Sequence, residues 1–581
     1  MDRRVIWAVA LMMLVALLPT FFFKRPAVDA GREPRVAGPV TGDSVHVAGD
    51  SAGLSAEQAM PDDSVTRDSR PATRDQASIP ADTVIVSSPL YTYRISTRGA
   101  AMVGAELANY RTMASGASGR VELIRPGEQL YALAIVSGSD TMSLADWSFT
   151  PSARQVTVGD APAPVTFTGS NGSTSARITY TFQPGYGFDV DAQVGGVGAN
   201  GGLAMIGLGT GLENTEKDSA QNFSKYALVV KNSGADRTDF RSLDPGERKV
   251  LPGPFEWAAV KSKYFVASVF AFDSSSSAGR LSGVTATVPA SAPKNPNAVQ
   301  LEATMPVPAA GTIHFRGYVG PMEYDQLRAI GHDFDDVNPY GWPGVRTVIR
   351  FFAVPVRWLL VQMHSQLNLT YGVVLILFGI LVRVLLWPLN QKAMRANMRM
   401  QELQPQLKAA QERHKDNPQM LQQEMFRLYK EYGVNPMSGC WPMMLPMPIL
   451  FALFFVFENA IELRGQAFLW LPDLAQHDPL YVIPVLMGLS MWAVSKVGQM
   501  GMPPNPQMKM MLYVMPIMMT FFFLRFAAGL NLYYLVSNLA SIPQQWMLGQ
   551  ERKRRTARAI VNVVTEEGKA GRREAGKGKR R

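Results

Sequence analysis

The stretch LILFGILVRVLLWPLNQ, Leu375 to Gln391, decides the fold of the C-terminal part of the chain. It is apolar enough to enter a lipid bilayer, yet it carries Arg383 among aliphatic neighbours. An arginine keeps its charge in proteins, and at mid-bilayer that charge costs from roughly 3 to about 10 kcal/mol or more. Two explanations stay open at this point. The side chain snorkels to the nearby cytoplasmic surface, or it faces a hydrated cavity.

Composition divides the 581 residues into two parts, because Gly, Ser, Thr and Asp are frequent before about residue 350 and Leu, Met and aromatics after it. The single cysteine, Cys440, excludes a disulfide framework, a CxxC redox pair and a cysteine-rich zinc site. The segment GLGTG at 207–211 lacks the spacing of a phosphate loop and is interpreted as turn glycines. The six histidines are scattered without an HExxH motif. We therefore expect no catalytic residues, no metal and no cofactor, and a protein that is not an enzyme.

Apolar segments predict a polytopic α-helical membrane bundle. Val5 to Phe23 is 19 residues without a charge, long enough to cross a bilayer as a signal anchor, with a cleaved signal peptide as the alternative. The run from Met510 to Leu548 is too long for one crossing, and Ala527-Ala528-Gly529 is expected to turn it into a hairpin. Six spans result: 1–23, 367–389, 436–463, 479–499, 510–527 and 529–548.

Charge sets the orientation of these spans. Residues 390–435 carry 8 basic and 5 acidic residues, and the tail from Glu551 to Arg581 carries 12 basic and 4 acidic ones. Basic loops stay in the cytoplasm, so both segments and the loop 500–509 are placed there, while the loop 464–478 faces outward. Both termini are then cytoplasmic. The chain is expected in the cell inner membrane, with residues 24 to about 340 in the periplasm.

The exported region is expected to begin with a disordered tether, because residues 24–80 contain no Phe, Tyr or Trp. Residues 81–335 then show the two-residue period of strands, as in Tyr91, Tyr93 and Ile95. Many short strands separated by Gly and Asn turns predict an antiparallel β-sandwich, so the fold class is multi-domain α+β. An amphipathic helix at 340–364, with Arg346, Arg350 and Arg357, is expected to lie along the outer membrane surface.

The cytoplasmic segment 390–435 is interpreted as a helical hairpin. Asn417 and Pro418 have the residue types of an N-cap and a first-turn position, and predict the start of its second helix. Its methionines suit changing apolar partners, although packing within the hairpin seam explains them equally well. They are Met394, Met398, Met400, Met420 and Met425.

Polar residues also recur at membrane depth. Asn531, Asn538 and Gln545 are spaced by seven residues and therefore share one helix face, with Ser541 beside it. Ser490 and Ser495 add polar groups from the fourth span. Hydrogen bonding between helices is the ordinary explanation for such residues. Together with Arg383, however, they favour a water-filled substrate groove over snorkelling alone.

Ordered motifs throughout the chain resemble the YidC membrane protein insertases of bacteria with an outer membrane. They are LVRVLLWPLNQKAMRANMRMQELQPQL, LYKEYGVNPMSGCWPMMLPMPI, LWLPDLAQHDPLYVIPVLMG and AAGLNLYYLVSNLASIPQQ, with WAAVKSKYF at 257–265 and YVGP at 318–321. The resemblance implies that Arg383 is the groove arginine, that the hairpin receives substrates, and that the sandwich resembles sugar-binding folds without being an enzyme. Three departures concern the groove lining: Pro446, the turn Phe526 to Leu530, and Pro543.

The expected function is therefore insertion, folding and assembly of inner-membrane proteins, alone or with the Sec translocon that the resemblance implies. Nascent membrane proteins and membrane lipids are the expected partners, and DNA is not. The basic tail, with Arg552, Lys553, Arg554 and Arg555, is expected to contact a ribosome or lipid head groups, or to act only as a topology signal. The alternative function is an organic-anion transporter with Arg383 as counter-charge. Such transporters usually show repeated halves, and this sequence shows none.

Overall fold

The computed structural model describes residues 83–271, 280–338, 340–341, 345–415, 417–432, 447–502 and 506–578. The expected first span at 1–23 and the tether at 24–80 lie outside the described residues, as do Cys440 and Pro446. The side chains of Met398 and Met400 are also outside the description.

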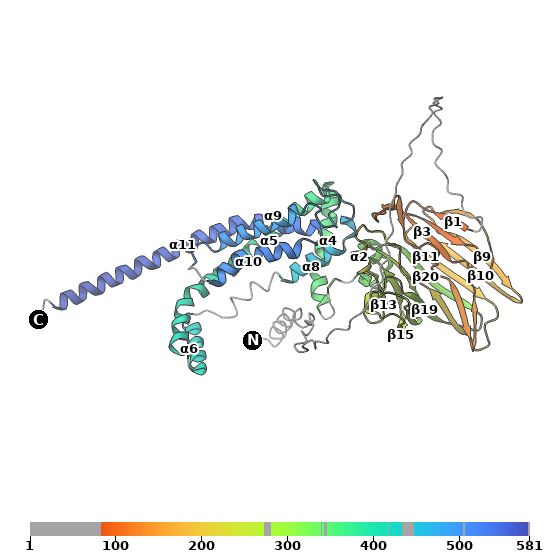
Figure 1. Cartoon of the computed structure of the whole chain (residues 1–581), viewed down its shortest axis with the longest axis horizontal. Coiled ribbons are helices and arrows are strands. Elements are labelled where there is room, and N and C mark those ends of the chain that lie inside the picture. The colour runs from red at the N-terminus through yellow and green to blue at the C-terminus, as the bar shows by residue number, and fades with distance from the viewer. Residues whose placement is uncertain are drawn as a thin grey trace, which may run out of the picture. The chain divides into compact units, whose positions relative to one another are not determined.

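The described residues 83–271 and 280–321 form twenty strands in three sheets (Figure 1). The five-stranded sheet has the order β4 (Arg120–Glu122), β3 (Met102–Arg111), β2 (Tyr91–Ser96), β1 (Thr83–Ser87), β8 (Gln155–Thr157). The nine-stranded sheet has the order β14 (Ala235–Asp239), β13 (Ala227–Lys231), β16 (Trp257–Lys261), β17 (Phe265–Phe270), β20 (Thr312–Pro321), β11 (Gly187–Val194), β10 (Thr174–Phe182), β9 (Ala163–Asn171), β7 (Phe149–Pro151). The six-stranded sheet has the order β15 (Arg248–Phe255), β18 (Leu281–Thr287), β19 (Gln300–Val307), β12 (Gly202–Gly207), β5 (Leu133–Ser137), β6 (Asp140–Ser143).

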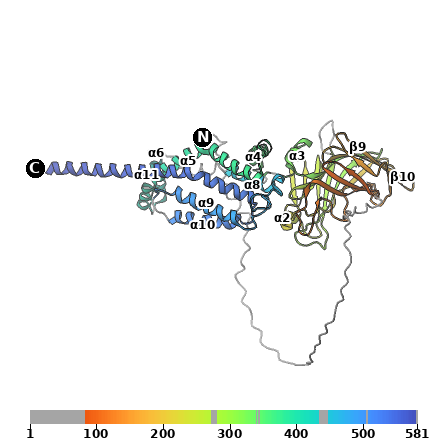
Figure 2. The same ribbon diagram turned by 90° about the horizontal axis from the view of Figure 1, so that it is seen from above.

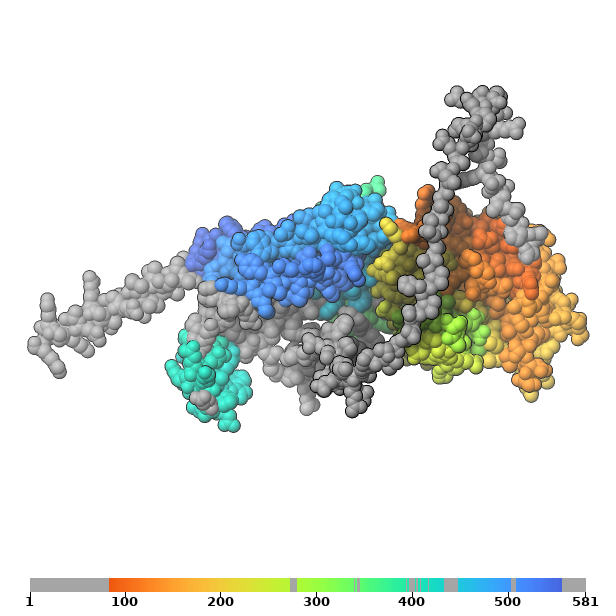
Figure 3. Space-filling view, in the orientation of Figure 1, coloured from red at the N-terminus to blue at the C-terminus, as the bar shows by residue number. Residues whose placement is uncertain are grey.

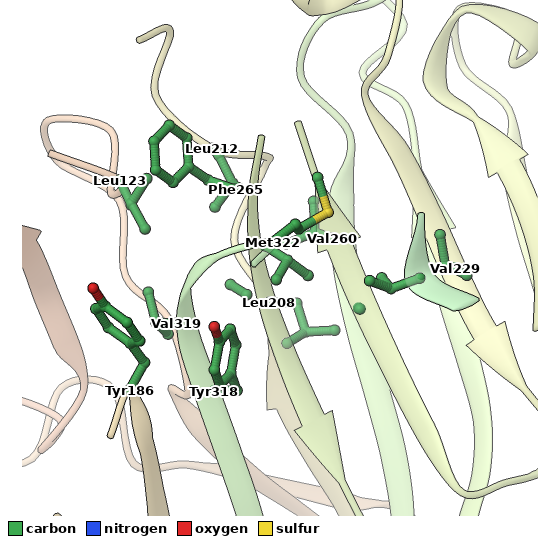
Figure 4. Packing of buried hydrophobic residues seen from close by; sticks show 14 of the residues in the cluster. Leu123, Tyr186, Leu208, Leu212, Val229, Val260, Phe265, Tyr318, Val319 and Met322 are labelled. Atoms are coloured by element: carbon green, nitrogen blue, oxygen red, sulfur yellow. The ribbon is translucent and has the colours of Figure 1, made fainter. Parts of the chain in front are cut away.

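Alternating apolar residues place one face of β2, β10 and β11 in the core, whereas β13, β16 and β17 are buried along their whole length. Tyr91, Tyr93 and Ile95 of β2 are fully buried, as the period predicts. The hairpin of β10 and β11 pairs Phe182 with Phe188 and closes around the QPGYG turn. Figure 4 shows part of this core, where Tyr186, Tyr318 and Val319 pack beside Leu208. Of the three glycines interpreted as turn residues at 207–211, Gly207 is instead the last residue of β12. Gly209 and Gly211 follow the strand with positive φ angles of 70° and 123°.

The sandwich differs from the prediction in one detail of pairing. β1 and β8 run parallel, whereas the other strand pairs of the described sheets are antiparallel. Short helices join strands at α2 (Ser219–Phe223) and η1 (Phe240–Ser242), and α3 (Tyr324–Ile330) and η2 (Phe334–Val337) follow the last strand, β20. Residue-level alternation could not reveal the parallel pair, because both pairing modes expose side chains with the same period of two.

The C-terminal half is helical (Figures 1 and 2). Its helices are α4 (Arg346–Leu367), α5 (Tyr371–Arg413), α6 (Pro418–Glu431), α8 (Met447–Asn459), η4 (Ile461–Leu463), α9 (Val482–Gly498), α10 (Pro506–Phe523) and α11 (Ala528–Gly578). Both views show α5, α9, α10 and α11 running alongside one another. Among the described residues, one helical segment, Tyr371–Lys392, is long and apolar enough to cross a membrane. Pro448–Asn459, Val482–Gly498 and Met508–Phe523 are shorter apolar segments.

The turn between α10 and α11 differs from the prediction. Gly529 does not form the turn, because α10 ends at Phe523 and α11 begins at Ala528. Instead, Gly529 lies in the first turn of α11, where a Cβ atom would stand 3.1 Å from the carbonyl oxygen of Leu474. The glycine therefore permits a close approach of two backbones, which is a different use of its missing side chain.

Two arginines of α4, the helix expected along the outer membrane surface, bind acidic groups of the protein itself. Arg350 donates to Asp335 and Asp336, at 2.6 and 2.9 Å. Arg357 is buried, and its Nη2 lies 2.5 Å from Oε1 of Glu462. Ion pairs with Asp335, Asp336 and Glu462 thus hold the arginine-bearing face of α4 against the rest of the protein. The exposed face of the helix is the apolar one, with Phe351 and Trp358.

Candidate functional site

Arg383 lies on α5 and points toward α11. Its Nε donates to the backbone carbonyl of Ser537 at 3.0 Å. Among the described residues, this is the one hydrogen bond that the guanidinium of Arg383 makes. Its two Nη atoms are not among the buried atoms that lack a partner. An arginine offers five N–H donors in a rigid fork. The remaining donors of Arg383 are therefore available to water, lipid phosphate or a carboxylate.

A hollow of about 500 Å³ opens beside this guanidinium. It lies between α5 and α11, and almost all of its lining is apolar. The lining residues are Ile376, Ile380, Arg383, Val384, Trp387, Val536, Leu539 and Ala540. A cation at the edge of an apolar surface attracts anions strongly, because the low dielectric constant weakens screening.

The polar stripe of α11 lies on a different face of the helix. Asn538 Nδ2 donates to Ser490 Oγ of α9 at 3.1 Å, and Asn531 Nδ2 donates to the carbonyl of Phe523 in α10 at 3.0 Å. At about 100° of rotation per residue, Asn538 points away from Val536 and Ala540 of the hollow. The structure therefore does not bring this stripe together with Arg383.

Two of the remaining predicted groove residues, Ser541 and Gln545, also face their own helix or α9. Ser541 donates to the carbonyl of Asn538 at 2.7 Å, and Ser495 is half-buried on α9. Gln545 approaches Gly498 of α9, where an added Cβ would lie 3.1 Å from its Oε1. The bond of Ser541 lies within α11, while Asn538 and Gln545 provide the interhelical hydrogen bond and the close packing that polar residues commonly make between membrane helices. Residues of α9, α10 and α11 form one continuous blue surface in Figure 3.

Gln544 is a site residue that the sequence reasoning missed. It is buried, and its Nε2 donates to the carbonyl of Trp387 at 3.0 Å. Gln544 follows Ser537 by seven residues and therefore shares its face of α11, toward α5. A helical wheel of α11 that starts at Ser537, the residue bound by Arg383, would have predicted Gln544. The seven-residue spacing of Asn531 and Asn538 instead pointed to its neighbour Gln545.

The hairpin contains two of the predicted features. Asn417 accepts a hydrogen bond from the amide of Met420, which confirms it as the cap of α6. The first arm of the hairpin is the continuation of α5, which reaches Arg413. Met420 is exposed, while Met394 and Met425 are half-buried. Gln406 Nε2 donates to the hydroxyl of Tyr432 at 2.6 Å and joins the two arms.

The basic cluster of the tail splits into two roles. Arg552 donates through Nη1 to the carbonyls of Gly498 and Met500, at 2.8 and 3.0 Å, and so caps the end of α9. An arginine there satisfies carbonyls that lack intrahelical donors. Lys553, Arg554 and Arg555 are exposed. Of the four residues expected to contact an external anion, Arg552 is thus engaged inside the protein.

The fold defines a class of protein in which a β-sandwich domain is joined to a bundle of apolar helices. Two family models match the chain, one described as YidC periplasmic domain over residues 83–359 and one as 60Kd inner membrane protein over residues 362–555. The membrane protein insertase YidC of Chloroherpeton thalassium is 35% identical over an alignment of 399 residues, and the match covers 64% of this chain and 66% of that protein. The insertase of Chlorobium limicola is 30% identical over 504 residues, 80% of this chain and 82% of its own length. A crystal structure described as an active YidC insertase covers 81% of this chain and 93% of its own, at 16% identity and a TM-score of 0.31.

The chain belongs to the YidC family of membrane protein insertases. Members of this family are inner-membrane proteins with a periplasmic domain, and the sandwich at 83–321 falls within the matched periplasmic region.

Proposed function

We propose that this protein inserts nascent membrane proteins into the inner membrane and assists their folding, alone or with the Sec translocon. Family membership supports the class of activity, and one observation supports the route: the partly unengaged guanidinium of Arg383 beside the hollow of α5 and α11. A client must move a polar tail outward while its apolar segment enters lipid. In this proposal Arg383 attracts acidic groups of that tail and keeps water in the hollow.

Two driving forces suffice for this reaction without a nucleotide. An anion moving outward along the membrane potential gains about 2.3 kcal/mol per 100 mV. The apolar segment then gains roughly 25 cal/mol for each Å² that it removes from water. The exposed Met420 and the half-buried Met394 and Met425 of the hairpin offer a first apolar surface in the cytoplasm.

The proposed topology has six spans with both termini in the cytoplasm. The residues from 24 to about 340 are exported, and the segments 390–435, 500–509 and 549–581 remain inside. The positive charge of the inner segments supports this orientation. The exposed Lys553, Arg554 and Arg555 are the residues of the tail that we assign to a ribosome or to lipid head groups.

Reconstitution of Arg383 variants into vesicles tests the role of the guanidinium. With a client that has a short acidic tail, Arg383→Glu is expected to slow insertion by about tenfold or more, equivalent to ~1.4 kcal/mol. Arg383→Lys keeps the charge and loses the fork, so a smaller loss is expected. The matched control is Arg525→Glu, since Arg525 is exposed and lies between α10 and α11. Normal insertion by Arg383→Glu would refute the role, and uptake of labelled organic anions by the same vesicles would instead favour a transporter.

A further inference from the structure

The loop between α8 and α9, residues 460–481, is tied to the sandwich through Arg464. The side chain of Arg464 is 3% exposed, and that of its partner Glu216 is 7% exposed. Nε of Arg464 lies 2.7 Å from Oε1 of Glu216. Nη1 and Nη2 donate to the carbonyls of Arg111 and Thr215, each at 3.0 Å. Three nitrogen atoms of one guanidinium thus bind three groups of the sandwich.

Further contacts support this attachment. The guanidinium of Arg464 lies 5.3 Å from the ring centre of Phe265, which belongs to the core cluster in Figure 4. Lys225 of the sandwich pairs with Glu458 near the end of α8, at 3.0 Å. Burial raises the pKa of Glu216, although Arg464 opposes this shift. A buried charge of this kind becomes costly when its partner is removed.

The same loop organises the ends of two helices. The carbonyls of Leu474 and Gln476 accept the amides of Gly529 and Ala528, at 2.8 and 2.6 Å, in the first turn of α11. Asp478 is fully buried and accepts the amide of Ile483, in the first turn of α9, at 2.7 Å. Amides in the first turn of a helix have no intrahelical acceptor, so the loop supplies what these helix ends need.

A short chain of hydrogen bonds joins the two halves of the loop. Oδ1 of Asp473 accepts the amide of Gly465 at 3.0 Å and that of Ala475 at 2.8 Å. Gly465 follows Arg464 directly, and Ala475 follows Leu474. Asp473 therefore connects the residue after Arg464 to the segment whose carbonyls hold α11.

We propose that Arg464 is a positioning residue whose ion pair with Glu216 holds the α8–α9 loop against the sandwich, so that the sandwich fixes the outer ends of α9 and α11 for client insertion. The link to insertion rests on the function proposed above. The link between Arg464 and the loop does not, and it is measured on the resting protein.

Thiol labelling in the full-length protein tests the attachment. Cys440 is replaced by Ser, and Leu474, which is fully buried, is replaced by Cys as a reporter in the loop. A water-soluble maleimide is expected to label this reporter slowly in the parent. Arg464→Met should accelerate labelling by about tenfold or more, because local opening becomes easier. Glu216→Gln retains the shape of the side chain and should accelerate it less, and Arg464→Lys should fall between Arg464→Met and the parent.

Controls separate loosening of the loop from unfolding. Arg98→Glu breaks an exposed ion pair with Asp146 and should label like the parent. A second reporter, Val190→Cys in the buried face of β11, should stay protected in each variant whose sandwich is folded. Parent-like labelling of the Leu474 reporter in both Arg464→Met and Glu216→Gln would overturn the proposal. Faster labelling with unchanged insertion would retain the attachment and overturn its part in client insertion.

Discussion

Lys261 is a lysine that is buried in the core of the sandwich. It lies on β16 with 1% of its surface exposed, and its Nζ donates to Oδ1 of Asn338 at 2.8 Å. Burial lowers the pKa of Lys261 well below its usual value, Arg237 and Lys225 lower it further, and Asp239 opposes them. The unfolded chain therefore binds a proton that the folded protein does not, wherever the pH lies between the two pKa values.

Lys261→Met is expected to remove a pH dependence of stability. In the parent, the free energy of unfolding should rise as the pH increases toward about 10.4, by up to about 1.4 kcal/mol per pH unit. Lys261→Met should lose this slope. Its free energy of unfolding should exceed that of the parent most at the lowest pH of this range. Thermal unfolding of the full-length protein in detergent at several pH values measures the effect. Lys217→Met, at an exposed position, should retain the slope of the parent. An unchanged slope in Lys261→Met would show that the buried amine is not responsible.

At the scale of elements, the sequence predicted the type of most helices and strands but not how they continue or turn. The period of two found β2, β10 and β11, and the Asn-Pro pair found the start of α6. Charge and apolarity change sharply near Asn390, where the end of the second span was expected, and α5 runs through this point and through Pro388 as one helix. The faces of α11 could not be assigned from seven-residue spacing alone, since that spacing identifies a stripe without saying which neighbour it contacts.

The length of α11 makes a prediction about the tail. One helix of 51 residues carries Lys553, Arg554 and Arg555 on a continuous backbone. If these residues bind phosphates, removal of 551–581 should abolish co-sedimentation with ribosomes, and binding by the intact protein should weaken steeply between low and high salt. Arg552→Gln should instead disturb the end of α9, because this side chain caps it. Salt-independent co-sedimentation, or binding that survives the truncation, would exclude the assignment.

At the scale of the whole molecule, composition separated the sandwich from the helices, and the motifs pointed to the family that the comparisons confirm. The link between the two parts could not be predicted. Arg464 and Glu216 are 248 residues apart in sequence, and each is an ordinary charged residue until the fold buries them together. The arginines of α4 illustrate the same limit, because their carboxylate partners become visible only in three dimensions.

The proposed orientation predicts opposite accessibility for two exposed positions. In the Cys440→Ser background, Leu469→Cys lies in the α8–α9 loop and Met420→Cys in the hairpin, and the native side chains are 74% and 47% exposed. A membrane-impermeant maleimide added to spheroplasts should label only Leu469→Cys, and Met420→Cys should react after lysis. Labelling of both positions from the same side would refute the placement of the hairpin in the cytoplasm.

Pro543 lies within α11 without ending it. A proline has no amide hydrogen, so the carbonyl four residues earlier loses its usual intrahelical donor. That carbonyl belongs to Leu539, whose residue lines the hollow beside Arg383. Two carbonyls of neighbouring turns of α11 thus differ in their donors: the oxygen of Ser537 accepts from Arg383, and the oxygen of Leu539 lacks the amide that residue 543 would otherwise offer.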